Sequence, residues 1–242
     1  MSKTAIVIGV GPVNGLGAQL AIRFADQGLH VLVAGRTKDR LDEVVEVISA
    51  QGGRAAAFVA DATDETDINA LFEHAGADLD LAIYNAGNNT PGKLAEMDAD
   101  YFEQSWRVCC FGGFLFGRAA LNSMLARDDD AGGTILFTGA SASLRGRPNF
   151  GAFNSSKGAL RNMAQAMAKE YGGLGIHVGH VVVDGPIGGD KIMTRFPDYA
   201  EQLGEAGMIS IDGIVDGFDF LYNQPSRAWS FEIDVRTSME NW

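Results

Sequence analysis

Short apolar runs alternate along the chain with longer stretches in which apolar residues recur every three to four positions. The apolar runs are rich in Val, Ile, Leu and Ala, which is typical of strands buried on both faces of a parallel sheet. We expect strands at residues 5–10, 30–34, 55–60, 79–84, 134–138, 176–183 and near 231–235. We expect helices at residues 15–28, 40–50, 65–75, 98–127, 151–171 and around 214–222. This alternation predicts a single α/β domain over residues 1–242, with a doubly wound parallel sheet flanked by helices.

Composition narrows the class of protein. The 242 residues are 46% hydrophobic, which is enough to fill a large core, and the formal net charge is −12. Nucleic acids and anionic membrane surfaces attract basic patches, so we expect neither as a partner. Cys109 and Cys110 are adjacent and cannot easily form an unstrained disulfide with each other, which fits a reducing cytoplasm. With no signal-peptide pattern and no long apolar run, we expect a soluble cytoplasmic protein.

A glycine-rich turn follows the first expected strand and opens the first expected helix. Glycines at positions 11, 15 and 17 let the backbone turn tightly and approach a pyrophosphate. The helix N-terminus offers free N–H groups to the anion. We therefore expect Gly11, Asn14, Gly15 and Leu16 to bind the pyrophosphate of a dinucleotide, with an ordinary glycine-rich turn as the alternative.

The residues after the second expected strand bear on which dinucleotide binds. This is where an acidic side chain would accept a hydrogen bond from a free ribose 2′-hydroxyl. The chain instead has Arg36 and Lys38, which suit a 2′-phosphate through charge-assisted hydrogen bonds. We expect NADP(H) in preference to NAD(H). The alternative is that both cations are simply solvated residues before a helix.

These features resemble the short-chain dehydrogenase/reductase family, and the resemblance covers nearly the whole chain. The spacing of the three glycines is that of the family's turn, which implies a Rossmann-type domain. Asp61 and Ala62 end the third expected strand, where the family uses an aspartate to contact adenine. Asp61 is open to a second interpretation, as a helix N-cap or turn residue.

Two further segments carry the resemblance. Asn85, Ala86 and Gly87 follow Tyr84 and look like the family's Asn-Asn-Ala-Gly with its first Asn changed, although a plain loop would read the same way. Lys157 matches the lysine of the family's Tyr-x-x-x-Lys motif. The resemblance implies that Asn85 and Lys157 hold the nicotinamide half of the cofactor. It also places Ile187 at a backbone contact to the carboxamide.

The catalytic set departs from the family. The resemblance implies a tyrosine that moves the proton, a serine that orients the substrate and an asparagine that anchors a relay water. Phe153 stands at the tyrosine position, Ala140 at the serine position and Cys109 at the asparagine position. The Pro-Gly after the sixth expected strand is Asp184-Gly185. Of the tetrad only Lys157 is retained, so the general acid is missing from its usual place.

Several residues are candidates to replace what is lost. Ser141 or Ser143 would orient a substrate, and Asp184 follows the sixth expected strand at the ligand-binding edge of the sheet. Arg145 and Arg147 would hold an anionic substrate. For each, solvation or a turn hydrogen bond is the plainer alternative. His177 and His180 lie three apart on a strand, point to opposite faces and make no metal pair.

The sequence supports two hypotheses about function. The first is an atypical NADP(H)-dependent oxidoreductase that acts on a small carbonyl or alcohol substrate with a non-standard proton donor. The alternative is an NADP(H)-binding protein without redox turnover, a sensor or a structural partner. The resemblance implies a homodimer or homotetramer formed through helices 98–127 and 151–171, and a mobile lid around residues 186–195.

Overall fold

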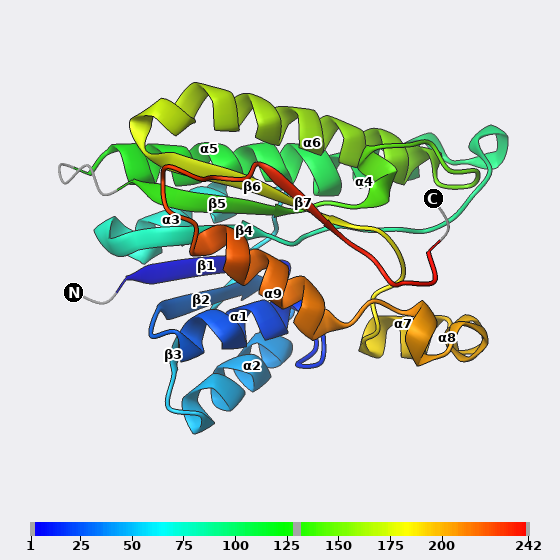
Figure 1. The fold of residues 1–242 in the computed structure, drawn as a ribbon, viewed down its shortest axis with the longest axis horizontal. Helices are drawn as coiled ribbons and strands as arrows, with labels where there is room; N and C mark the ends of the chain where they lie inside the picture. Colours follow the sequence, from blue (N-terminus) through cyan, green and yellow to red (C-terminus); the bar gives the residue numbers. More distant parts are fainter. Residues whose placement is uncertain (1–2, 128–131, 241–242) are drawn as a thin grey trace.

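The strands form one parallel sheet in the order β3-β2-β1-β4-β5-β6-β7 (Figure 1). The structure is a computed structural model that describes residues 3–127 and 132–240. Its strands are β1 (Thr4–Ile8), β2 (His30–Gly35), β3 (Arg54–Val59), β4 (Leu79–Tyr84), β5 (Gly133–Thr138), β6 (Ile176–Val183) and β7 (Glu232–Val235). Its longer helices are α1 (Leu16–Asp26), α2 (Lys38–Ala50), α3 (Glu65–Ala75), α4 (Ala99–Trp106), α5 (Gly112–Leu125), α6 (Gly151–Tyr171) and α9 (Ile211–Tyr222). The predicted doubly wound sheet is confirmed.

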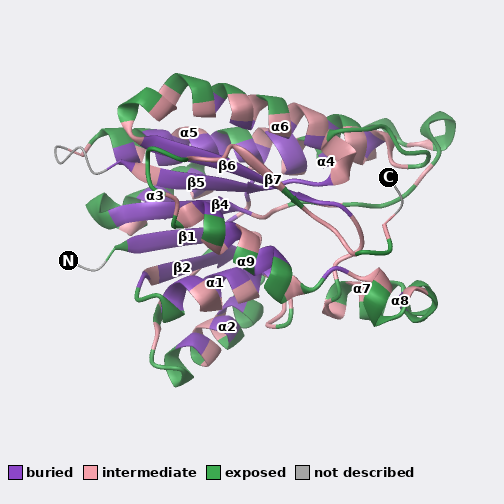
Figure 2. Ribbon diagram, in the orientation of Figure 1, coloured by how far each residue is buried: buried purple, intermediate pink, exposed green. Residues whose placement is uncertain are grey.

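Alternate strand residues face two separate cores. One core gathers residues such as Ala5 and Val7 with the inner faces of α1, α2 and α9. The other gathers Ile6 and Ile8 with α3, α5 and α6. Figure 2 shows most of the sheet buried between these helical layers, whose outer surfaces are exposed. This two-sided burial is why the strands read as continuous apolar runs rather than alternating ones.

The prediction of one continuous helix over residues 98–127 was wrong in detail. The structure has α4, then a π-helical turn at Arg107–Phe111, then α5. The extra residue in each π-helical turn displaces backbone carbonyls from the regular ladder. The buried Tyr84 hydroxyl donates to one of them, the carbonyl of Val108, at 2.5 Å. The segment expected as a lid, around residues 186–195, contains the helix α7 (Asp190–Arg195). A second short helix, α8 (Pro197–Leu203), follows it.

By length and composition, one helical stretch in the described residues would be able to cross a membrane. It is Ala99–Leu125, and 61% of its apolar window is buried inside the protein. Burial of that extent is typical of a core helix, and this stretch packs against α3, α6 and β4. Its apolar character is therefore explained by the fold.

The strand order reverses direction between β1 and β4. From β1 the chain builds outward through β2 and β3, and it then returns to place β4 on the other side of β1. At such a switch point the loops leave the carboxyl ends of neighbouring strands in opposite directions and open a crevice for a ligand. The glycine-rich turn follows β1 and Asn85 follows β4, so both lie at this crevice.

Candidate functional site

The glycine-rich turn combines close packing with open space. A Cβ on Gly17 would lie 2.7 Å from the Gly9 carbonyl oxygen and 2.9 Å from Asn85 Nδ2, so only glycine fits there. A Cβ on Gly11 would meet nothing within 4 Å. Gly15 is the N-cap of α1 and supplies no side chain to the free N–H groups of the first turn. The turn is therefore built to admit an anionic ligand next to the backbone.

The two cations after β2 differ in their surroundings. Lys38 is exposed and pairs with Asp42 one turn along α2, at 2.5 Å. Arg36 is exposed and has no hydrogen bond or ion pair within residues 3–127 and 132–240. Arg36 is thus the cation that is available to a ligand, and Lys38 is explained by its helix.

Asp61 makes a local turn, and only its Oδ1 accepts hydrogen bonds from the described residues. Its Oδ1 accepts from the backbone N–H and the hydroxyl of Thr63, both at 2.8 Å. Burial raises the pKa of Asp61, but the bonds from Thr63 and the charges of Arg36 and Arg107 outweigh it, so the pKa lies below its usual value. Asp61 is therefore ionised beside Arg36, and the neighbouring Ala62 is buried.

A chain of hydrogen bonds connects the ends of three strands to α6. The Asn85 side chain donates to the Gly9 carbonyl at 3.2 Å and accepts from the Thr138 hydroxyl at 2.9 Å. Lys157 Nζ donates to the Thr138 carbonyl at 2.7 Å. The structure thus brings together Asn85 and Lys157, as expected, through Thr138, which the sequence analysis missed.

Lys157 is buried at this junction. Its residue is 4% exposed, and its Nζ lies 5.9 Å from the ring centroid of Phe153, one turn earlier on α6. Gly87 lies on the other side, where a Cβ would be 3.7 Å from Nζ. Burial lowers the pKa of Lys157, opposed by Cys109 and reinforced by Lys191.

The two candidate serines are placed differently. The Ser143 hydroxyl donates to the Ala140 carbonyl at 2.7 Å, so it is taken up by its own turn. Ser141 is half-buried, and its hydroxyl has no hydrogen bond to the part of the chain that the structure describes. Ser141 is the one of the pair that remains able to contact a substrate.

Cys109 lies at the π-helical turn and faces Asn88. Its thiol is 3.6 Å from Asn88 Oδ1 and 3.8 Å from the Asn88 carbonyl, and Ser105 donates to the same amide oxygen at 2.9 Å. Asn88 was not among the predicted site residues, although it directly follows Asn85-Ala86-Gly87. Its amide lies beside the position where the family pattern has an asparagine.

The residues proposed as substitute acid and anion holder belong to an ion cluster. Asp184 is buried, and its carboxylate contacts Arg145 Nη2 at 3.0 Å and Arg236 Nε at 3.5 Å. Arg145 also lies 3.7 Å from Glu240. The cluster joins the loops that follow β5, β6 and β7, so Asp184 serves as a structural carboxylate. Arg147 lies over the Phe150 ring.

A second ion cluster joins α6, β6 and β7 and was also missed. Glu232 on β7 accepts from Arg161 at 2.6 and 2.8 Å, and His180 Nδ1 lies 2.9 Å from its Oε2. Burial raises the pKa of Glu232, but His180 and Arg161 outweigh it and hold the pKa at about 2. His180 is fully buried, and its Nε2 has no hydrogen-bond partner in the described structure.

The base of the expected lid packs against the nucleotide-binding turn. Ile187 forms a parallel bridge with Ile209, and the Gly188 N–H donates to the Ile209 carbonyl at 2.9 Å. A Cβ on Gly189 would lie 2.9 Å from the Asn14 carbonyl oxygen. The segment that carries Ile187 is therefore held close to Asn14, as a shared cofactor site requires.

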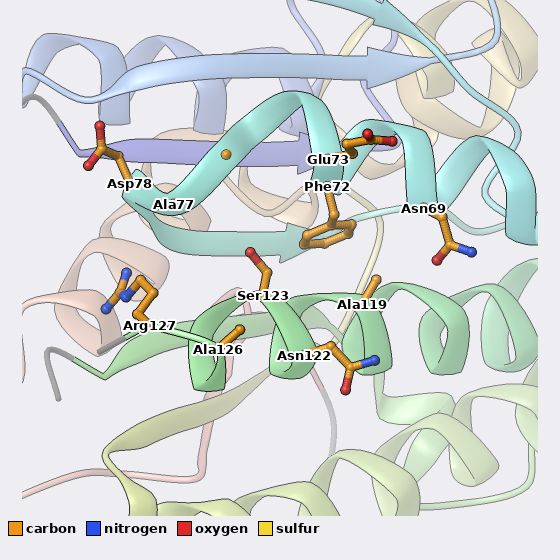
Figure 3. A pocket seen from close by; sticks show the side chains of 11 residues that line it. Asn69, Phe72, Glu73, Ala77, Asp78, Ala119, Asn122, Ser123, Ala126 and Arg127 are labelled. Atoms are coloured by element: carbon orange, nitrogen blue, oxygen red, sulfur yellow. The ribbon is translucent and has the colours of Figure 1, made fainter. Parts of the chain in front are cut away.

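A groove of about 810 Å³ lies elsewhere, between α3 and α5. Figure 3 shows its side chains, which include Asn69 and Glu73 from α3 and Asn122 and Ser123 from α5. The groove reaches residues that precede β4 and β5, at the amino edge of the sheet. It is thus on the edge opposite to Lys157 and plays no part in the candidate site.

Comparison with known proteins agrees with this geometry. The model of the family described as short chain dehydrogenase matches residues 3–193. A short-chain dehydrogenase from Rhodopseudomonas palustris has 34% sequence identity and a TM-score of 0.81, with 97% of this chain and 98% of that chain covered. Versicolorin reductase 1 from Dothistroma septosporum is 32% identical over 203 residues, which are 81% of this chain and 74% of the relative. A metagenomic short-chain oxidoreductase in complex with NADP, at 23% identity and a TM-score of 0.81, shares the fold.

The chain therefore belongs to the short-chain dehydrogenase family. It is an oxidoreductase of that type, which uses a nicotinamide dinucleotide and acts on a small-molecule substrate. Among the described residues, no group of three or more His, Cys, Asp or Glu side chains is arranged to hold a metal ion.

We expect the His180 cluster to make stability depend on pH. Burial lowers the pKa of His180 despite the opposing attraction of Glu232. The unfolded chain binds a proton at His180 near pH 6.5, whereas the folded protein does so only at lower pH. The free energy of unfolding should therefore fall as the pH drops from about 6.5 towards the folded pKa, by up to about 1.4 kcal/mol per pH unit. Urea unfolding at pH 7.5, 6.5 and 5.5 measures this.

His180→Asn keeps a donor for Glu232 and removes the titration. We expect a shallower pH dependence in this variant, while the exposed His74→Asn serves as the matched control. Equal slopes for wild type and His180→Asn would show that the cluster does not contribute.

Proposed function

We propose that this chain is an NADP(H)-dependent oxidoreductase that interconverts a small carbonyl compound and its alcohol, with a proton donor other than tyrosine. The observation that carries the proposal is the hydrogen-bonded chain from Gly9 through Asn85 and Thr138 to Lys157. It places a lysine ammonium group at the same crevice as the glycine-rich turn. A protein that only bound the adenosine phosphate half would have little use for that lysine.

The residues of the crevice fit the cofactor in order. Gly11, Asn14, Gly15 and Leu16 lie at the free N-terminus of α1 and would hold the pyrophosphate. Asp61 with Ala62 would contact adenine, and Ala86, Gly87, Ile187 and Lys157 would surround the nicotinamide half. When bound, the cofactor supplies or accepts the hydride, and the protein orients the reactants and handles the proton.

The preference for NADP(H) rests on Arg36. Its guanidinium is exposed at the end of β2, with Asp61 as a neighbouring charge, and it makes no ion pair in residues 3–127 and 132–240. A guanidinium with free donors matches a phosphate group better than a hydroxyl. NAD(H) is the alternative, and it would leave Arg36 without a ligand partner.

Calorimetric titration with NADPH, NADP, NADH and NAD tests this preference. We expect tighter binding of the two phosphorylated forms, and a loss of about 10–100-fold in their affinity with Arg36→Ala, because a charge-assisted hydrogen bond is removed. Lys38→Ala is the matched control and should change affinity little, since Lys38 pairs with Asp42. Equal binding of NADH and NADPH would overturn the preference.

Replacing Phe153 with tyrosine tests the missing proton donor. Phe153 is half-buried, and its ring centroid lies 5.9 Å from Lys157 Nζ, so a tyrosine there would add a hydroxyl to the ring that the ammonium group lies over. We expect Phe153→Tyr to increase carbonyl reduction, by less than the full contribution of a general acid of about 10²–10⁴-fold, because the wild type already has a proton donor of another kind. Steady-state rates with NADPH over a panel of aldehydes and ketones measure this, with Phe150→Tyr as the control.

The outcome also decides between the two hypotheses. If the cofactor binds and neither wild type nor Phe153→Tyr reduces any member of the panel, the oxidoreductase proposal fails. The protein would then be better described as one that binds NADP(H) without redox turnover.

The exposed aromatic face of α4 and α5 supports a homodimer or homotetramer. Phe102, Trp106 and Phe114 are 38–40% exposed, and Trp106 stacks on Phe111 with ring centroids 5.8 Å apart. Phe116 and Met167 do not belong to this face, because both are buried in the core. A row of exposed aromatic side chains on a monomer is a common mark of an interface.

We expect Trp106→Glu to shift the protein towards monomers, because it places a charge in the middle of this face. Sedimentation velocity of wild type and variant measures the assembly state. Phe220→Glu on α9 is the control, since Phe220 is 54% exposed on the opposite layer. A monomeric wild type at micromolar concentration would contradict the assembly through this face.

A further inference from the structure

Lys157 carries a buried ammonium group, and few polar groups offset the cost of removing its charge from water. It carries three N–H donors and no acceptor. One donates to the Thr138 carbonyl at 2.7 Å, and no carboxylate pairs with Nζ in the part of the chain that the structure describes. The Phe153 ring lies 5.9 Å away, at the outer limit of a cation–π contact. Two donors are therefore left for a ligand.

The charged groups that face Lys157 do not supply a counterion. They are Lys191 from α7, His180 from β6 and the thiol of Cys109 from the π-helical turn. Glu232 is the carboxylate of the neighbouring cluster, and it is already bound to Arg161 and His180. The environment thus disfavours a permanent positive charge on Lys157 and makes its proton easier to lose.

The ammonium group lies below the backbone of Gly87. A Cβ on Gly87 would have Lys157 Nζ at 3.7 Å and Cys109 Sγ at 3.8 Å as its nearest neighbours, so a group of that size fits there in ordinary contact. Gly87 is exposed, whereas Lys157 is buried, so a ligand would approach Nζ from the side of Gly87. A ligand atom above Gly87 would therefore lie within reach of the unused donors of Nζ.

We propose that Lys157 is itself the proton donor of this enzyme, acting from Nζ on the substrate oxygen in the place of the hydroxyl that Phe153 lacks. The inference rests on the proposed oxidoreductase function and goes beyond it by naming the acid. Buried lysines take such roles because their pKa responds strongly to the surroundings. Phe153 contributes by presenting an apolar ring, which leaves the substrate as the acceptor for the ammonium group.

The proposed step balances as follows. In reduction, the carbonyl carbon accepts a hydride with its electron pair from the reduced nicotinamide, and the π electrons of the C=O bond move to oxygen. That oxygen takes a proton from Nζ, so an O–H bond forms, an N–H bond breaks and Lys157 becomes a neutral amine. Water then returns the proton. In oxidation, the neutral amine accepts the alcohol proton.

Lys157→Arg separates proton donation from charge. Arginine keeps the positive charge and the donors for Thr138 and the cofactor, but it does not lose its proton near neutral pH. We expect carbonyl reduction to fall by about 10²–10⁴-fold, while NADPH affinity measured by calorimetry changes less than about tenfold. Lys169→Arg, at an exposed position on the same helix, is the matched control.

The protonation state of Lys157 can be measured directly by NMR in the cofactor-free protein. The chain has six lysines, so ¹³C-lysine labelling gives few resonances, and the Lys157 signal is the one that disappears in Lys157→Arg. We expect it to titrate below the ordinary pKa of a lysine side chain, because the ammonium group is buried. The rate of reduction by wild type should fall as the pH rises through this midpoint, because the acid must be protonated.

The two levels of the proposal fail in different ways. If wild type reduces carbonyls and Lys157→Arg keeps the rate, or if Lys157 titrates at the ordinary pKa of a lysine side chain, the proton-donor role is overturned and the oxidoreductase function stands. If NADPH binds but no substrate is reduced by wild type or Phe153→Tyr, the proposed function fails and the donor role fails with it.

Discussion

The Asn85 side chain connects the ends of three adjacent strands, and the rest of the site depends on this connection. The amide nitrogen of Asn85 donates to the carbonyl of Gly9, which follows β1. The amide oxygen accepts from the hydroxyl of Thr138 at the end of β5. The contact requires Gly17 to lie directly against Gly9 and Asn85. Close backbone approach at the switch point thus sets the position of the nucleotide-binding turn relative to Thr138, and Thr138 in turn holds Lys157.

The chemistry of the site is decided by what surrounds that lysine. Phe153 and Cys109 stand where the resemblance implies a tyrosine and an asparagine, and the carboxylate of Glu232 is held by Arg161 and His180. None of these residues supplies a carboxylate to the buried ammonium group. Because a buried charge without a partner is costly, the site favours transfer of the proton over a fixed ion pair.

The C-terminal part of the chain supports this arrangement from the far side. Arg236 and Glu240 follow β7 and join the Arg145–Asp184 cluster, while Glu232 within β7 holds His180. The family model ends at residue 193, before these residues. The tail therefore adds partly buried charge clusters that reach β6 and the loops that follow β5 and β6.

Local pattern was enough to predict the sheet, its helices and the glycine-rich turn. Strands buried on both faces appear as continuous apolar runs, and a glycine-rich turn directly precedes α1 in the sequence. The motif spacing also identified Phe153 and Lys157. Pattern did not reveal the π-helical turn, and the Tyr84 hydroxyl that donates to the Val108 carbonyl within it is distant in the sequence. Nor did it separate Arg36 from Lys38, or show that Asp184 is taken up by Arg145, because each depends on which side chains meet in space. The sequence by itself determined the scaffold and placed Phe153 four residues before Lys157. Only the tertiary structure decided what surrounds Lys157, because it buries the ammonium group next to Thr138, Phe153 and Gly87.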